Sequence, residues 1–179
     1  MDARTIMVIR HGEKPDDSGA QGVDESGHSD PRGLSARGWQ RAGALLRFFA
    51  PRDGHFSDPR IRTPQTIFAA TPNASSRRSP LTVQPLAEFL GLPVRCEYSA
   101  ETQVTQLLDA CNQVAGVVLV CWRHTSMRQL AQHLLQANAV APEWDAARFD
   151  LVWVFTGSDG RWSLQQVPQL LLPRDASTP

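Results

Sequence analysis

The sequence predicts an α/β fold in three layers, with a mostly parallel central sheet and helices on both of its faces. Short apolar runs of the kind found in buried strands alternate along the chain with amphipathic segments of helical spacing. Two of these runs, residues 6–9 and 117–122, each lead directly into an Arg-His pair. Strands and helices that alternate in this way are typical of parallel sheets whose crossover helices cover both faces.

The length and composition of the chain restrict its class. With 179 residues, no internal repeat and no linker, it is expected to form one domain over residues 1–179. Lys plus Arg and Asp plus Glu both number 18, and this balance argues against a general nucleic-acid binder. No apolar run has the length of a membrane span, and the N-terminus has no signal-peptide h-region. The three cysteines lack metal-type spacing and are expected to be reduced, so we expect a cytoplasmic protein.

The individual elements follow from periodicity and from helix stop signals. Residues 13–33 show no hydrophobic periodicity and are expected to form a long loop. A helix is predicted from Leu34 to Ala50, with Ser35 as its N-cap. The next predicted elements are a strand at 66–70, a helix at 80–90 ended by Gly91, a strand at 93–98, a helix at 101–115 and a strand at 117–122.

The last third of the chain completes the sheet. Thr125 or Ser126 is expected to cap a helix that carries leucines at helical spacing. Residues 151–155 and 162–167 flank a Gly-Ser-Asp-Gly stretch, which predicts a hairpin at the sheet edge. Residues 173–179 are expected to form a frayed tail.

The two Arg-His pairs suggest an anion site. Residues just beyond the carboxyl end of a strand lie in the crevice where α/β sheets bind ligands. If the two strands are parallel neighbours, His11 and His124 reach the same edge, and Gly12 allows the chain to turn there. Arginine donates pairs of hydrogen bonds to phosphate, and a neutral imidazole can attack phosphorus. A lone histidine most often has no chemical role, but two matching pairs favour a phosphate site.

Arg10-His11-Gly12-Glu13 after a buried strand, with His124 at a second strand end, resembles the histidine phosphatase superfamily, which has a phosphoglycerate mutase-like fold. The continuation Lys14-Pro15 is similar to a small-enzyme branch of that superfamily. The resemblance implies that His11 is the nucleophile and that Arg10 binds the phosphoryl group. It also implies that His124 is a second, protonated histidine. The first predicted helix also begins as in this superfamily, with Leu34, Ser35, Gly38, Arg41 and Ala42.

Other site residues follow from the same resemblance. A further phosphate-binding arginine is expected after the second strand; Arg78 fits its spacing to a threonine, and Arg77 is the alternative. The amide of Thr125, at a helix N-terminus, is expected to be an additional donor. The usual acid motif of the superfamily is missing, and Glu101 is the predicted proton donor, the alternative being a first-turn Glu stabilised by the helix dipole. Glu13 is expected to orient the loop or an arginine.

The resemblance implies a phosphatase that acts on a small phosphomonoester or on phosphohistidine through a covalent phosphohistidine intermediate. The expected partner is a phosphorylated small molecule or a phosphoprotein, with no nucleic acid, no membrane, no metal and no other cofactor. The short chain favours a phosphatase over a phosphomutase, and the missing acid motif leaves a non-catalytic phosphate-binding module as an alternative. The polar residues of the first loop match no metal-site spacing and are expected to be solvated: Asp16, Asp17, Asp24, Glu25 and His28.

Overall fold

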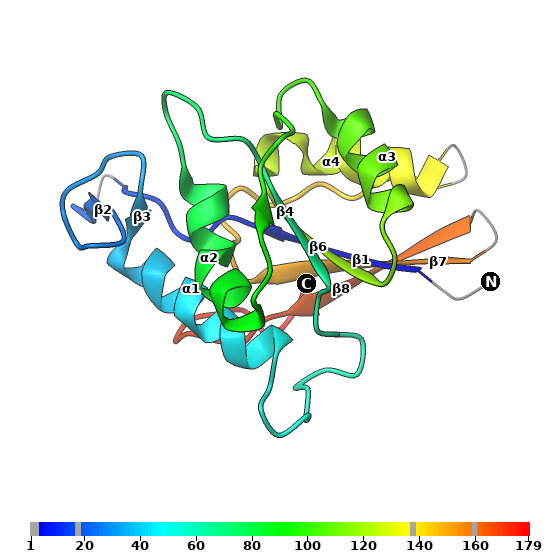
Figure 1. Cartoon of the computed structure of the whole chain (residues 1–179), viewed down its shortest axis with the longest axis horizontal. Helices are drawn as coiled ribbons and strands as arrows, with labels where there is room; N and C mark the ends of the chain where they lie inside the picture. Colours follow the sequence, from blue (N-terminus) through cyan, green and yellow to red (C-terminus); the bar gives the residue numbers. More distant parts are fainter. Residues whose placement is uncertain (1–3, 17–18, 137–138, 159–160) are drawn as a thin grey trace.

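A six-stranded sheet forms the middle layer of the structure, with strand order β5-β4-β6-β1-β7-β8 (Figure 1). The computed structural model describes residues 4–16, 19–136, 139–158 and 161–179. Strands β5, β4, β6 and β1 are parallel, and β7 and β8 are antiparallel. The strands are β1 (Arg4–Arg10), β4 (Thr66–Ala69), β5 (Val94–Arg95), β6 (Val117–Trp122), β7 (Leu151–Ser158) and β8 (Arg161–Pro168). The predicted α/β fold with a mostly parallel sheet is confirmed.

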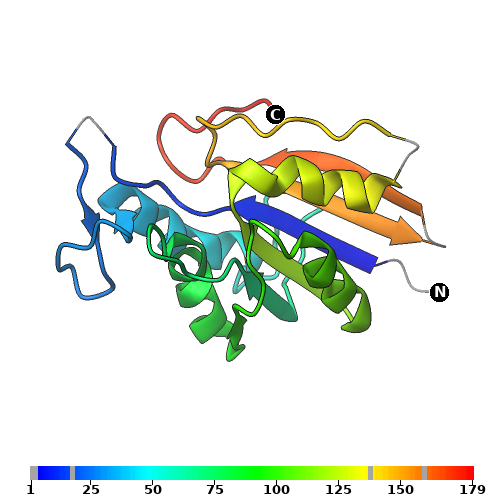
Figure 2. The same cartoon turned by 90° about the horizontal axis from the view of Figure 1, so that it is seen from above.

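Helices cover both faces of this sheet (Figure 2). Successive residues of a strand point to opposite faces, and β1 follows this rule. Ile6 and Val8 pack with α3 (Val104–Gln113) and α4 (Met127–Leu135), whereas Met7 and Ile9 pack on the other face. The helices on that other face are α1 (Ala36–Phe49) and α2 (Arg78–Leu90). A central strand that is apolar on both faces therefore holds the two helix layers together.

The predicted helices are present with shifted ends. The hydroxyl of Ser35 caps α1 by accepting a hydrogen bond from the amide of Gly38 (3.2 Å). Helix α2 begins two residues before the predicted start and ends at Gly91, whose φ of 66° is left-handed. The strand predicted at residues 93–98 is too long, because within this range only β5, which has two residues, pairs with the sheet.

Two stretches expected to be irregular are ordered by tertiary contacts. Within the first loop, β2 (Gly22–Val23) pairs with β3 (Leu34–Ser35) in a small second sheet. The prediction of a frayed C-terminal tail is wrong for residues 173–176. Asp175 is buried, and the amide of Ala176 donates to Oδ2 of Asp150 (2.7 Å).

The predicted hairpin is present as β7 and β8 at the sheet edge, although two residues of its turn, 159 and 160, lie outside the described residues. Among the helices in the described part of the chain, none has the length and apolar character needed to span a membrane.

Candidate active site

The first feature of the site is the meeting of two strand ends. Strands β1 and β6 are parallel neighbours, with Arg10 opposite Trp122. The amide of His11 donates to the carbonyl oxygen of Trp122 (3.3 Å). Arg123 and His124 follow directly, so both predicted Arg-His pairs lie at the same edge of the sheet.

His11 is held in one tautomer. Its side chain is buried, and Nδ1 lies 2.8 Å from the carbonyl oxygen of Gly12. A carbonyl oxygen can only accept, so Nδ1 carries the hydrogen and Nε2 keeps its lone pair. Burial is the main cause that lowers the pKa of His11 to about 3; the bond to Gly12 opposes this effect, and the charges of Arg10, Arg78 and His124 add to the lowering. His11 is therefore neutral near pH 7, with a nucleophilic nitrogen available.

Arg10 is fixed by a segment that the sequence did not associate with the site. Its Nη1 donates to the carbonyl oxygens of Ala146 and Arg148, and its guanidinium carbon lies 3.8 Å from the ring centroid of Phe149. Burial and the charge of Arg78 lower the pKa of Arg10 to about 10, which still leaves it charged at neutral pH. Residues 146–149 lack the periodicity of a strand or helix, so no sequence signal could have revealed this clamp.

Arg77 and Arg78 differ in their surroundings. Arg77 forms ion pairs with Glu25 and with Asp30 (2.7 Å) in the first loop. Arg78 opens α2, and its charge lowers the pKa of His11 and of Arg10. The pKa of Arg78 is itself lowered, mainly by burial. Because the carboxylates of the first loop neutralise the charge of Arg77, Arg78 is the better candidate for binding phosphate.

The turn after His11 requires glycine. The amide of Gly12 donates to Oγ1 of Thr82 (2.8 Å), and this hydroxyl donates to the carbonyl oxygen of Arg78 (2.8 Å). A Cβ atom on Gly12 would lie 3.0 Å from the carbonyl oxygen of Gly38, and one on Gly38 would lie 2.4 Å from that of Glu13. The turn after His11 thus fits between the first turns of α1 and α2.

Glu13 orients arginines, as expected. Its Oε1 accepts from Arg41 Nη2 (2.7 Å) and from Arg37 Nε (3.1 Å). Its backbone oxygen accepts from the amide of Ser35 (2.9 Å). The residue two positions after His11 is therefore attached to the start of α1.

His124 and Thr125 lie in η1 (His124–Ser126), a 3₁₀ turn that precedes α4. Burial, then the charges of Arg10 and Lys14, lower the pKa of His124 from its ordinary value. This shift favours the neutral form of His124 in the ligand-free protein, and a protonated His124 in the transition state stays a prediction. The amide of Thr125 belongs to this turn rather than to an α-helix N-terminus, because α4 begins at Met127, and the Ser126 side chain makes no capping bond.

The environment of Glu101 does not suit a general acid. Its carboxylate accepts from Oγ of Ser99 (2.6 Å), forms an ion pair with Arg123 and is about half exposed. The bond from Ser99 and the charge of Arg123 lower the pKa of Glu101, whereas an acid catalyst must hold its proton near neutral pH. These contacts argue against the predicted role of Glu101 as proton donor. Arg123, for which no separate role was predicted, is the partner of this carboxylate.

Acidic residues of the first loop form hydrogen bonds and ion pairs with nearby protein groups. Asp24 accepts from the amides of Ser26 (2.9 Å) and His28 (2.8 Å), and Glu25 pairs with Arg77. Asp17 lies outside the described residues. Among the described residues, no three His, Cys, Asp or Glu side chains gather in a way that could hold a metal ion.

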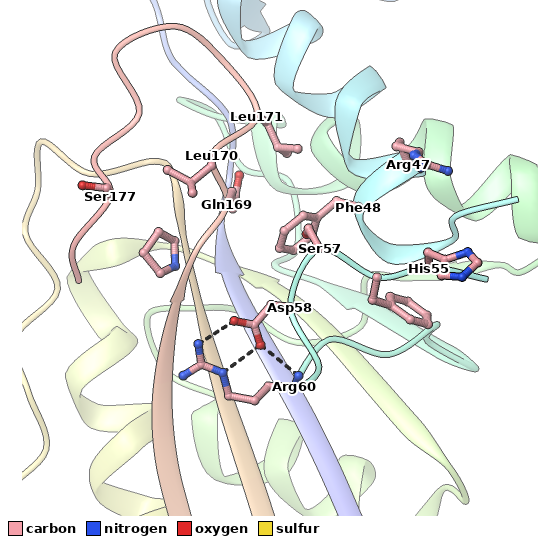
Figure 3. Close-up of a pocket in the computed structure, with 12 residues that line it drawn as sticks. Arg47, Phe48, His55, Ser57, Asp58, Arg60, Gln169, Leu170, Leu171 and Ser177 are labelled. Carbon is pink, nitrogen blue, oxygen red and sulfur yellow. Dashed lines mark hydrogen bonds and ion pairs between the residues drawn. The ribbon is translucent and has the colours of Figure 1, made fainter. Parts of the chain in front are cut away.

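A separate hollow of about 480 Å³ lies away from His11, between the end of α1, the following loop and the segment after β8 (Figure 3). Its lining includes Arg60, paired with Asp58 (2.6 Å), and Arg47, paired with the nearby Asp53 (2.9 Å). The cations of this wall are already neutralised, and none of the predicted site residues lines it.

Comparisons with known proteins agree with this architecture. No family model and no curated protein matches the sequence. Among solved structures, the histidine phosphatase SixA complexed with tungstate matches with a TM-score of 0.58 and 14% identity, covering 92% of this chain and 97% of that chain. A phosphoglycerate mutase from Plasmodium falciparum matches with a TM-score of 0.60 and 11% identity, covering 99% of each chain. The alpha-ribazole phosphatase from Shigella flexneri matches with a TM-score of 0.56 and 12% identity, covering 90% of this chain and 94% of that chain. The chain therefore has the same fold as these solved structures, the phosphoglycerate mutase-like fold.

Proposed function

We propose that this protein is a phosphatase that hydrolyses a small phosphomonoester or phosphohistidine through a covalent intermediate on His11. The observation that carries the proposal is the state of His11. Its Nε2 bears a lone pair because Nδ1–H is bound to Gly12, and the charges of Arg10 and Arg78 act directly on the ring. A neutral imidazole beside two guanidinium groups has the chemistry that phosphoryl transfer requires.

In the first step, Nε2 of His11 attacks phosphorus, and the bond from phosphorus to the leaving group breaks. Arg10 and Arg78 bind the equatorial oxygens, where negative charge is concentrated. The ring becomes positively charged, and the bond from Nδ1–H to Gly12 stabilises that charge. In the second step, water attacks phosphorus, the P–N bond breaks, and phosphate and neutral His11 are released.

We assign proton donation to His124 in place of Glu101. The charge of Arg10 helps to lower the pKa of His124, and a bound phosphate dianion would offset that charge. Substrate binding would thus favour the protonated form of His124, which then stabilises the transition state and protonates the leaving oxygen. In this scheme all positive charge comes from arginine and histidine, and no metal ion takes part. We propose a cytoplasmic enzyme whose substrate is a phosphorylated small molecule or a phosphoprotein.

The test is to trap the phosphoenzyme. The protein is mixed with acetyl phosphate carrying labelled phosphorus and quenched in alkali, where phosphohistidine survives. The wild type and a His55→Ala control, altered at an exposed histidine outside the site, should retain label, and His11→Ala should not. Label that persists in His11→Ala would remove His11 from the nucleophile role.

A non-catalytic phosphate-binding module is the second candidate, and the ionised state of Glu101 is the observation that favours it. This candidate predicts phosphate binding with neither label on His11 nor turnover of p-nitrophenyl phosphate. A mutase would instead pass the label to an acceptor substrate, whereas a phosphatase releases it to water.

A further inference from the structure

Three arginines at the sheet edge each have a buried Nε–H group without a hydrogen-bond partner. Among the described residues, five buried side-chain nitrogen or oxygen atoms lack a hydrogen-bond partner, and three of them are the Nε atoms of Arg10, Arg78 and Arg123. A buried donor without a partner is costly, and a bound ligand, ion or water is one way in which such a donor is satisfied. The charges of Arg10 and Arg78 act on His11. Arg123 comes from the other strand and has no part in the scheme above.

Contacts on two sides hold Arg123 in place. It follows β6 directly and lies one residue beyond the pairing of Arg10 with Trp122. One terminal nitrogen forms an ion pair with Glu101, and the other donates to the carbonyl oxygen of Thr71 (3.2 Å). Only 14% of the Arg123 side chain is exposed. The guanidinium is therefore positioned in advance at the edge where the phosphate would bind.

The ion pair with Glu101 directs Arg123 toward solvent, at the sheet edge that also carries His11. The charges of Arg10, Arg78 and His124 lower the pKa of His11. The charge of Arg123 lowers the pKa of Arg78. Its partner Glu101 is about half exposed and so marks the solvent side of the site. A ligand group that reaches Arg123 is thus attached to the phosphoryl group but distinct from it.

We propose that Arg123 binds a second oxyanion of the substrate, a carboxylate or a phosphate close to the transferred phosphoryl group. The planar guanidinium matches either anion, and it stays charged at any physiological pH. Lys14 adds positive charge on the same side, because it is exposed and its charge reaches His124. This inference rests on the proposed phosphate site and specifies the substrate class, a phosphate compound with a second negative group.

Binding of three phosphonates tests the inference without requiring turnover. Methylphosphonate has one anionic group, phosphonoacetate adds a carboxylate, and methylenediphosphonate adds a second phosphonate. Calorimetry on the wild type should show at least one of the last two binding about tenfold tighter than methylphosphonate, as expected for a charged hydrogen-bonded pair. Whichever binds tighter identifies the second group as carboxylate or phosphate.

Arg123→Gln should reduce this preference to less than about twofold while leaving methylphosphonate affinity nearly unchanged. Arg123→Lys keeps the charge without the fork and should retain part of the preference, which also tests the inference if the glutamine variant does not fold. The matched control is Arg47→Gln, which removes an exposed arginine from another ion pair and should leave the preference intact.

Two results would overturn the inference. One is a wild type with no preference for a second anion, and the other is an equal loss of affinity for all three phosphonates in Arg123→Gln. Failure of the proposed function would appear differently, as absence of phosphoenzyme on His11, because the phosphonates report binding alone.

Discussion

Arg41 and Asp175 form a buried ion pair that joins the C-terminal segment to the turn after His11. Arg41 Nη2 lies 2.8 Å from Oδ1 of Asp175 and 2.7 Å from Oε1 of Glu13, and the side chains of Arg41 and Asp175 are each 2% exposed. Burial alone would lower the pKa of Arg41, but its bonds to Asp175 and Glu13 raise it above its usual value. Residues far apart in sequence thus fix the chain just after His11.

Replacing Asp175 should destabilise the protein. Asp175→Ala leaves Arg41 buried with one of its two carboxylate partners removed, and breaking a buried pair in this way costs about 3 kcal/mol. Urea denaturation measures the change, with Asp53→Ala as the control for an exposed pair. Equal losses in the two variants would show that the burial of the Arg41 pair has no energetic consequence.

The stability of the protein should fall as the pH drops below about 6.5. The folded-state pKa of His11 is about 3, so the unfolded chain binds a proton that the folded chain does not between these two values. This single group contributes a slope of at most about 1.4 kcal/mol per pH unit in that window, with stability rising as the pH rises. Urea titrations of wild type, His11→Gln and His55→Gln at several pH values measure it. An unchanged slope in His11→Gln would contradict the prediction.

Glu101→Gln should leave most of the activity in place. The carboxylate is ionised and paired with Arg123, so it has no proton to give near neutral pH. We expect kcat on p-nitrophenyl phosphate within about threefold of wild type and an unchanged pH profile, whereas loss of a general acid costs about 10²–10⁴-fold. His124→Ala, in contrast, should show a loss in that range. A large loss of kcat in Glu101→Gln on the basic side of the profile would restore the acid role.

Arg78 and Arg77 should differ strongly in their effects on catalysis. Arg78→Ala removes a charge that acts on His11, and we expect kcat/KM to fall about 10²–10³-fold, as for other groups that stabilise transition-state charge. Arg77→Ala breaks ion pairs to the first loop and should lower kcat/KM by less than about tenfold. Steady-state kinetics on both variants provide the comparison. The assignment would have to be exchanged if Arg77→Ala were the more damaging change.

The local sequence determined the strands, the helices and the two strand ends at which the Arg-His pairs lie. The apolar runs before Arg10 and Arg123 predict buried strands, and the alternation of elements predicts their parallel pairing, because crossover helices leave few other arrangements. Gly12 was identified as the position of a sharp turn for the same local reason. Arg78 followed from its spacing, although only the ion pairs of Arg77 distinguish the two.

Tertiary structure alone decided the electrical state of the site. The low pKa of His11 and the clamp on Arg10 depend on burial by segments distant in the sequence, and no local pattern encodes burial of a particular nitrogen. The ion pair between Glu101 and Arg123 argues against an acid role for Glu101, and this pair joins residues 22 positions apart that no local pattern connects. Residues 173–176 are held in place because Asp175 forms an ion pair with Arg41. The sequence of this polar stretch does not indicate a partner that lies over a hundred residues away. The sequence thus specified which groups are present at the edge, and long-range packing set their charge and orientation.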